Sequence, residues 1–117
     1  MNPKIVFHNL KMEIELPTGF VICYYDTLMY VVYKELDCTL HFGDNEKYTV
    51  EATLKGLEYN LPETAFVRCN RNTIVNLHHC KEYNKTVSEI RMVDGAIFSL
   101  SRREKANFKA KRKNLKR

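Results

Sequence analysis

The first half of the chain alternates between apolar and polar residues, a pattern that predicts strands with one buried face. The clearest case is segment 11–16, in which Met12, Ile14 and Leu16 alternate with charged residues. Segments rich in β-branched and aromatic residues predict further strands, and these lie at 20–25, 28–33, 38–42, 47–52, 64–69, 87–92 and 96–100. Most of the chain is therefore predicted to be β-structure.

Short turns separate the predicted strands. Pro-Thr-Gly at 17–19, Asp-Thr at 26–27 and Gly-Asp-Asn at 43–45 interrupt the apolar segments, and 34–37 is typical of a hairpin loop. Asp94-Gly95 is the strongest hairpin signal in the sequence. Strands joined by such short connections pair antiparallel, whereas a parallel sheet needs helix-length crossovers, which this sequence lacks.

A short helix is predicted after the first group of strands. Leu54, Leu57 and Leu61 recur at helical spacing, Thr53 can cap the start, and Pro62 follows the end. With a last helix at the C-terminus, the pattern predicts a mostly β domain of hairpins, with roughly eight to ten short strands and two or three short helices.

The C-terminal segment 101–117 predicts a strongly basic last helix. Ser101 can cap it, with Glu104 completing a capping box, and the segment carries nine Lys or Arg residues beside this one Glu. Its apolar face is thin, so we expect its first turn to dock and its end to fray. Such a segment contacts phosphates without reading base sequence, and the alternative is a solvated helix.

Length and composition are those of one globular domain. The 117 residues suffice for a hydrophobic core. No apolar run approaches a membrane span and the N-terminus lacks a secretory signal, so we expect a cytoplasmic protein without a membrane partner. Cys23, Cys38, Cys69 and Cys80 form no C-x-x-C pair, and we expect them to be small buried residues without disulfides.

Charge is distributed unevenly along the chain. Residues 1–63 hold five Lys or Arg and ten Asp or Glu, whereas residues 64–117 hold fourteen Lys or Arg and four Asp or Glu. The two parts therefore carry net charges of −5 and +10, within a total of +5. This asymmetry predicts that the C-terminal half faces a polyanion, and nucleic acid is favoured over a merely solvated basic surface.

Neither a metal site nor a catalytic motif is predicted. Cys69, His78, His79 and Cys80 lie close in sequence, but three of them are consecutive and would point to alternate faces of a strand, unlike zinc ligands. The sequence has no nucleophile elbow, phosphate-binding glycine loop or paired-carboxylate motif. We therefore expect no enzyme activity, no cofactor, no metal and no small-molecule substrate.

Segment 66–76, FVRCNRNTIVN, places hydrogen-bonding side chains between apolar anchors. Arg71 and Asn72 are suited to base edges, because Arg pairs with guanine and Asn with adenine. Anchors on both sides would hold these side chains rigidly. The alternative is that Asn70 and Asn72 cap a turn while the arginines are solvated.

Two stretches of the sequence resemble one known family. FVRCNRNTIVNLHHCKEY at 66–83 and SEIRMVDGAIFSLSRR at 88–103 are similar to the motifs of the LytTR (LytR/AlgR-type) DNA-binding domain of bacterial response regulators. The resemblance covers residues 20–110, which leaves 1–19 as N-terminal strands and 111–117 as a basic C-terminal tail.

The resemblance implies an elongated fold of antiparallel β-sheets with small helices. Loops rather than a recognition helix would enter successive major grooves of double-stranded DNA, in a sequence-specific transcription regulator associated with the nucleoid. The implied base-contacting residues are Arg71, Asn72, Arg103, Asp37 and Cys38, the last two from an early hairpin loop. The implied phosphate-contacting residues are Arg68, Asn70, Arg102, Lys105 and Lys109. A homodimer on repeated half-sites is a further hypothesis.

Two positions depart from the family pattern. Relatives usually carry His-Arg-Ser where this chain has Asn70-Arg71-Asn72, which keeps hydrogen-bonding capacity but can change the preferred base step. They often carry Glu at the position of Val32, which predicts a different early loop here. The 117 residues leave no room for a receiver domain, so we expect no signal input by phosphorylation of this chain.

Two other functions stay open at this point. An RNA-binding β module would stack aromatic side chains on unpaired bases, although the aromatic residues here lie mainly in apolar strands. A protein-interaction domain would dock a partner through its acidic N-terminal half, or would pair the strand edges of segments 5–10 and 11–16 with another chain.

Overall fold

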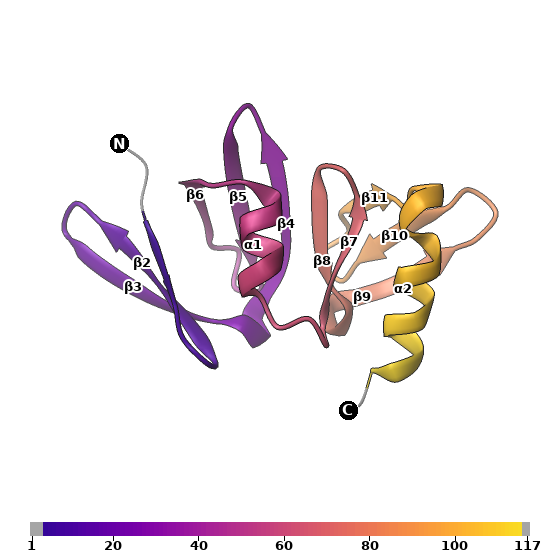
Figure 1. The fold of residues 1–117 in the computed structure, drawn as a ribbon, viewed down its shortest axis with the longest axis horizontal. Helices are drawn as coiled ribbons and strands as arrows, with labels where there is room; N and C mark the ends of the chain where they lie inside the picture. The colour runs from indigo at the N-terminus through magenta and orange to yellow at the C-terminus, as the bar shows by residue number, and fades with distance from the viewer. Residues whose placement is uncertain (1–3, 116–117) are drawn as a thin grey trace.

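The computed structural model describes residues 4–115, which form three sheets arranged along one long axis (Figure 1). The principal dimensions are 46 × 32 × 24 Å, so the protein is elongated. Eleven strands, all paired antiparallel, and two α-helices lie in this part of the chain. The predicted fold class, mostly β and built from antiparallel hairpins, is confirmed.

The N-terminal sheet lies at one end of the molecule. Its strands are β1 (Ile5–Phe7), β2 (Lys11–Leu16) and β3 (Gly19–Tyr24), in the order β1-β2-β3. Met12 and Ile14 are fully buried, which confirms the alternation predicted for β2. Because β2 is the middle strand, the hypothesis that segment 11–16 pairs its edge with another chain is wrong; the free edges belong to β1 and β3.

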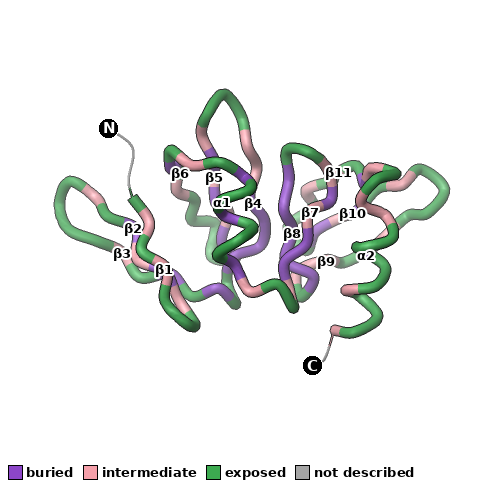
Figure 2. The backbone as a smooth tube through the Cα atoms, viewed as in Figure 1, coloured by how far each residue is buried: buried purple, intermediate pink, exposed green. Residues whose placement is uncertain are grey.

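The five-stranded central sheet has the order β6-β5-β4-β8-β7. Its strands are β4 (Leu28–Lys34), β5 (Asp37–Phe42), β6 (Lys47–Glu51), β7 (Phe66–Asn70) and β8 (Thr73–Asn76). Its middle strands are buried on both faces, as Figure 2 shows for β4 and β8. Ile74 packs toward the N-terminal sheet, whereas its neighbour Val75 packs toward the C-terminal sheet. This two-sided burial explains why these strands are nearly continuous apolar runs.

The C-terminal sheet consists of β9 (Cys80–Asn84), β10 (Glu89–Met92) and β11 (Ile97–Ser99), in the order β11-β10-β9. The predicted Asp94-Gly95 turn joins β10 to β11. Asp94 Oδ1 accepts a hydrogen bond from the Ala96 N–H at 3.0 Å, and Gly95 has a φ of +95°, which a residue with a side chain rarely adopts.

Both predicted N-caps form, but the predicted capping box does not close, because the Ser101 N–H donates to the Cys69 carbonyl instead of to Glu104. The α-helices are α1 (Leu54–Asn60) and α2 (Arg102–Asn114), and single 3-10 turns lie at η1 (Tyr25–Thr27) and η2 (Leu77–His79). Thr53 Oγ1 accepts from the Gly56 N–H at 3.0 Å, and Ser101 Oγ accepts from the Glu104 N–H at 3.3 Å. No helix within residues 4–115 is long and apolar enough to cross a membrane.

Helix α2 is docked along its whole described length. Phe108 is buried, with its ring centroid 5.5 Å from that of Tyr83, and Leu115 packs against the same cluster. Lys111 Nζ donates to the Phe66 carbonyl at 3.0 Å. The expected fraying is therefore not found up to residue 115, and residues 116–117 lie outside the described residues.

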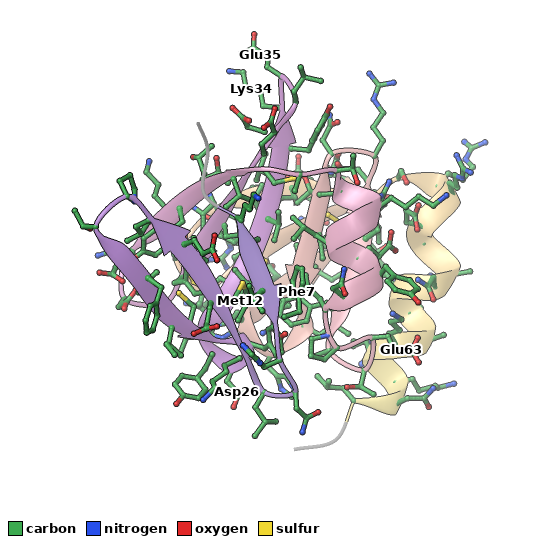
Figure 3. All side chains as sticks on the ribbon, turned by 60° about the vertical axis from the view of Figure 1, so that its left-hand side comes forward. Phe7, Met12, Asp26, Lys34, Glu35 and Glu63 are labelled. Carbon is green, nitrogen blue, oxygen red and sulfur yellow. The ribbon has the colours of Figure 1, made fainter. Side chains whose placement is uncertain are left out.

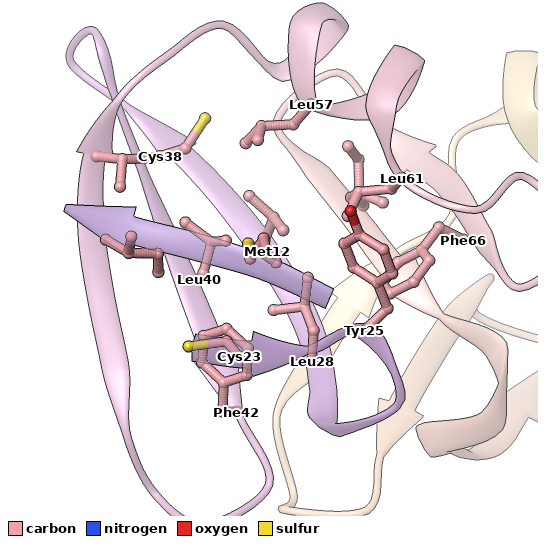
Figure 4. Close-up of a cluster of buried hydrophobic side chains, with 14 of the residues drawn as sticks. Met12, Cys23, Tyr25, Leu28, Cys38, Leu40, Phe42, Leu57, Leu61 and Phe66 are labelled. Carbon is pink, nitrogen blue, oxygen red and sulfur yellow. The ribbon is translucent and has the colours of Figure 1, made fainter. Parts of the chain in front are cut away.

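Two hydrophobic clusters fill the spaces on either side of the central sheet. The first lies between the N-terminal and central sheets and includes Met12, Leu40 and Leu57 (Figure 4). The second lies between the central sheet, the C-terminal sheet and α2, and includes Ile90 and Phe108. Each outer sheet therefore buries one face against the sheet that they share.

The four cysteines are free thiols, as predicted. Cys23, Cys38 and Cys69 are buried, and Cys80 is half-buried. Burial is the main cause that raises the pKa of Cys23 to about 11 and that of Cys69 to about 12. These thiols therefore stay protonated near neutral pH and behave as small hydrophobic residues.

Asn76 is a buried polar residue that joins three segments. Its Nδ2 donates to the Leu28 carbonyl at 2.9 Å, and its Oδ1 accepts from the His78 N–H at 2.9 Å. Only 1% of the residue is exposed, so water cannot replace these bonds. Asn76 therefore holds β8 to the start of β4 and shapes η2.

We predict that Asn76→Ala lowers the free energy of unfolding by about 2–4 kcal/mol, because the buried Leu28 carbonyl and the partly buried His78 N–H lose their partner. Urea unfolding followed by circular dichroism measures this change. Asn107→Ala, on the exposed surface of α2, is the matched control and should change stability little. An equal effect of the two substitutions would contradict a structural role for Asn76.

Candidate nucleic-acid interface

Helix α1, strand β7 and the distant start of helix α2 meet at one groove. The groove has a volume of about 600 Å³ and lies between α1, the end of β7 and the first turn of α2. We name it the α1–α2 groove, and its lining residues are Lys55, Glu58, Arg68, Asn70, Arg71, Ser101, Arg103 and Glu104. Six of the predicted DNA-contacting or capping residues, including Arg71 and Arg103, are thus brought together.

The turn between β7 and β8 carries Arg71 and Asn72, which are both exposed. On either side of it, Val67 and Val75 are buried in the second cluster, so the predicted apolar anchors are present. The register of β7 against β8 shifts between residues 68 and 70, which marks a bulge next to the turn. A rigid pair of strands therefore presents the two polar side chains to solvent.

Asn70 fixes the shape of this turn. Its Oδ1 accepts a hydrogen bond from the Asn72 N–H at 2.9 Å, an arrangement typical of an Asx turn. Its Nδ2 donates to the Ser99 carbonyl at 2.9 Å and lies 3.4 Å from Ser99 Oγ. Asn70 therefore has the turn-capping role that the sequence left open. Its contact with a phosphate stays a prediction.

The first turn of α2 is tied to the same place. The Ser101 N–H donates to the Cys69 carbonyl at 2.9 Å, next to Asn70. Arg103 follows in the first helical turn and is exposed. Together with the Asn70–Ser99 bond, this contact fixes Arg103 relative to Arg71 across 32 positions of sequence.

Arg68 is less accessible than its neighbours. Its side chain is 21% exposed and its Nε lies 3.3 Å from Glu58 Oε1 on α1. The geometry of this ion pair is not that of a hydrogen bond, so Arg68 Nε is buried without a hydrogen-bond partner among residues 4–115. Arg68 thus lines the α1–α2 groove with one acidic neighbour and unused donor capacity.

The predicted early hairpin loop needs a correction at Cys38. Cys38 is fully buried, its Sγ donates to the Ala52 carbonyl at 3.3 Å, and burial is the main cause that raises its pKa to about 11. A side chain in the core cannot touch a base outside the protein. The tip of the β4–β5 hairpin is formed by Glu35 and Leu36, both with positive φ, and Figure 3 shows Glu35 at the outer end. Asp37 begins β5 and is half-buried.

The other predicted phosphate contacts lie on α2. Arg102 and Lys109 are exposed and Lys105 is half-buried. Positions 102, 105 and 109 are separated by three and four residues, so they share one side of the helix. Arg103 lies on a different side, toward the groove.

Two arginines in the first turn of α2 are electrostatically unusual. The N-terminus of a helix carries partial positive charge, so each cation there costs about 0.3–1 kcal/mol at low salt. Glu104, in the same turn, offsets part of this repulsion. An anion bound at this end of α2 would remove it, since helix N-termini favour negative groups.

The sequence cluster of cysteine and histidine does not converge. His79 Nε2 lies 2.6 Å from the Asp26 carbonyl, and Cys80 Sγ lies 3.7 Å from the Asn76 carbonyl. Within residues 4–115, no three His, Cys, Asp or Glu side chains are grouped so that they could hold a metal ion.

Comparison with protein families identifies the fold and the kind of domain. The family model described as the LytTr DNA-binding domain matches residues 19–113. The chain belongs to the LytTR family of DNA-binding domains. The resemblance that the motifs at 66–83 and 88–103 indicated is thereby confirmed, and so is the assignment to DNA-binding regulators.

A solved LytTR structure has the same fold. It is the LytTr DNA-binding domain of a response regulator from Bacillus cereus, with a TM-score of 0.75 and 24% sequence identity. The match covers 89% of this chain and 97% of that one. No curated protein matches this chain.

Sequence reasoning missed two residues of the α1–α2 groove, Lys55 and Glu58. Lys55 and Glu58 lie on α1, which is brought beside β7 only by tertiary packing. No local signal marks them. Glu104 was identified from sequence as part of a capping box, but not as a groove residue.

We predict that Asn70→Ala exposes the Asn72 amide to solvent exchange, because its acceptor is lost. Asn70→Asp keeps that acceptor but loses the donor to Ser99, so it should retain protection of the Asn72 amide. It should still lose about 0.5–1.5 kcal/mol of stability with the Ser99 bond. Amide hydrogen exchange by NMR separates the two variants, and equal exchange in both would contradict the assigned bonds.

Proposed function

We propose that this LytTR domain is a sequence-specific transcription regulator that binds the major groove of double-stranded DNA. Arg71 and Arg103 would contact bases, and Asn72 would contact a base beside Arg71. The protein would act on nucleoid DNA in the cytoplasm.

The observation that carries this proposal is that Arg71 and Arg103 both line the α1–α2 groove. Neither has an ion pair among residues 4–115, so their donors are available to a ligand. The bonds of Asn70 and of the Ser101 N–H fix their relative position before any DNA binds. Preorganised donors lose little entropy on binding and discriminate well between bases.

The phosphate contacts would come mainly from α2. Arg102, Lys105 and Lys109 share one side of the helix, which suits contact with a single DNA backbone. The first turn of α2 would bind an anion with both its charge and its free N–H groups. Arg68 would contact a phosphate that enters the groove in competition with Glu58.

The β4–β5 hairpin would supply a third contact. Asp37 remains our candidate for a base contact there, and its carboxylate suits the amino group of cytosine. Glu35 and Leu36 take the position at the tip that Cys38 cannot occupy. Two copies of the chain would occupy repeated half-sites on one DNA.

An RNA-binding module is a weaker candidate. Among residues 4–115, three aromatic residues are exposed: Phe20 and Tyr24 lie on the N-terminal sheet, away from the basic half of the chain, and Tyr59 alone lies on α1, beside the groove (Figure 1). Stacking on unpaired bases needs aromatic and basic residues side by side. Competition between duplex DNA and single-stranded RNA tests this alternative directly.

We predict that Arg71→Ala weakens binding to the preferred DNA site by about 1–3 kcal/mol and binding to random DNA very little. The preferred site is first selected from a random duplex pool, and affinities are then measured by mobility shift. Arg91→Ala is the matched control, because Arg91 is a half-buried cation on β10 that is paired with Glu82. Equal losses on both DNAs would make Arg71 a phosphate contact.

We predict that Lys109→Ala weakens binding to all sequences alike and reduces the slope of log affinity against log salt by about 1. The wild-type affinity itself should fall by orders of magnitude between ~50 and ~200 mM salt, since several phosphates are neutralised. Fluorescence anisotropy over a salt series measures both. A slope unchanged by the substitution would remove Lys109 from the interface.

A further inference from the structure

Strand β3 forms a free edge of the N-terminal sheet. Among residues 4–115 its only strand partner is β2, and the register between them runs without a shift from residue 19 to residue 24. In an antiparallel strand, the N–H and C=O groups of alternate residues point to opposite sides. Half of the backbone groups of β3 therefore lack a strand partner among residues 4–115.

The other free edges are protected. Strand β6 carries exposed Lys47 and Glu51, and β9 carries exposed Lys81 and Glu82. Strand β7 is covered by α2, while β1 and β11 are only three residues long. Charges, short length and covering elements are the usual means of blocking edge pairing. Strand β3 has none of them, since Gly19–Tyr24 contains no charge, no proline and no bulge.

The side chains on the solvent face of β3 are apolar. Phe20, Ile22 and Tyr24 alternate along the strand and are 62%, 38% and 53% exposed. Exposed apolar residues that adjoin an open edge are the features of a surface that another strand covers.

The sequence of β3 is complementary to itself. If two copies pair antiparallel about Ile22, then Ile22 faces Ile22 of the other copy and Phe20 faces Tyr24 on both sides. All three pairs lie on the same face of the combined sheet, because the residues have the same parity. Aromatic and β-branched cross-strand pairs of this kind stabilise antiparallel strands.

The charge distribution also favours a second copy of this chain as the partner of β3. Residues 64–117 carry a net charge of +10, and α2 lies at the opposite end of the long axis from the N-terminal sheet (Figure 1). Two copies joined through β3 would therefore hold their basic ends apart, where each end can contact its own stretch of DNA.

We propose that β3 pairs with β3 of a second copy of this chain, antiparallel and centred on Ile22, to form a continuous six-stranded sheet. This surface deepens the proposed occupation of repeated half-sites and rests on that proposal for its role on DNA. Three residue pairs form a small interface, below the size of stable dimers. DNA that carries two half-sites would raise the effective concentration of one copy near the other and so populate the pair.

Disulfide trapping tests the pairing without DNA. In the proposed register, the two Ile22 Cα atoms lie about 5.5 Å apart, within the range that a disulfide spans. Under mild oxidation, Ile22→Cys should therefore form a covalent dimer. Val87→Cys, at a more exposed apolar site in the turn between β9 and β10, should form no more covalent dimer than the wild-type chain.

The register gives a second check. Phe20→Cys should not link to itself, since the two positions would be about 13 Å apart along the strand. A mixture of Phe20→Cys and Tyr24→Cys chains should form the mixed dimer. Ile22→Cys that links no faster than Val87→Cys would overturn the pairing, and so would Phe20→Cys that links to itself as fast as Ile22→Cys.

Cooperative DNA binding tests the role of the pair. Ile22→Lys places a charge at the edge, so it should keep wild-type affinity for one half-site and lose cooperativity on two. Phe20→Lys should behave alike, and circular dichroism verifies that both fold. Cooperativity unchanged in both variants would overturn the proposal. A third outcome separates the two proposals. If the cysteine variants form disulfides in the proposed register but the chain binds no DNA, the proposed function is overturned and the β3 pairing is supported.

Discussion

Burial of both faces of the central sheet is the constraint on which the rest of the structure depends. The N-terminal and C-terminal sheets have three strands each, too few to be stable without covering one face. Both use the central sheet as their partner, so adjacent residues such as Ile74 and Val75 must serve different clusters. A slip of one residue in β8 would exchange them, and the two cores therefore fix the register jointly.

The fixed register places the polar turn of residues 71–72 at a defined point. Strands β7 and β8 are held by packing on both sides, and the turn projects from them beside the first turn of α2. Exposed side chains on a short turn between rigid strands are located far more accurately than those on a long loop. The scaffold thus accounts for how Arg71 and Arg103 are held at defined positions relative to each other.

Local signals predicted the elements, whereas tertiary contacts decided the site. The alternation at 11–16, the caps at Thr53 and Ser101 and the Asp94-Gly95 turn all depend on neighbours in sequence. The Asn70–Ser99 bond and the Glu58–Arg68 pair join distant segments, so no local pattern reveals them. Cys38 is different, because its alternation with Leu40 and Phe42 already placed it on the buried face of β5. The base contact predicted for Cys38 followed the motif resemblance, although this alternation already indicated burial of its side chain.

The two bonds of Asn70 give a physical meaning to one departure from the family pattern. Neutral histidine, the residue that the resemblance gives for this position in the family, also offers one donor and one acceptor. Histidine, however, gains a proton near pH ~6.5 and then has two donors and no acceptor. A carboxamide does not titrate in this range. The hydrogen bonds of Asn70 that join the β7–β8 turn to the segment before α2 therefore do not depend on pH in this range. A histidine at this position would make them depend on its protonation.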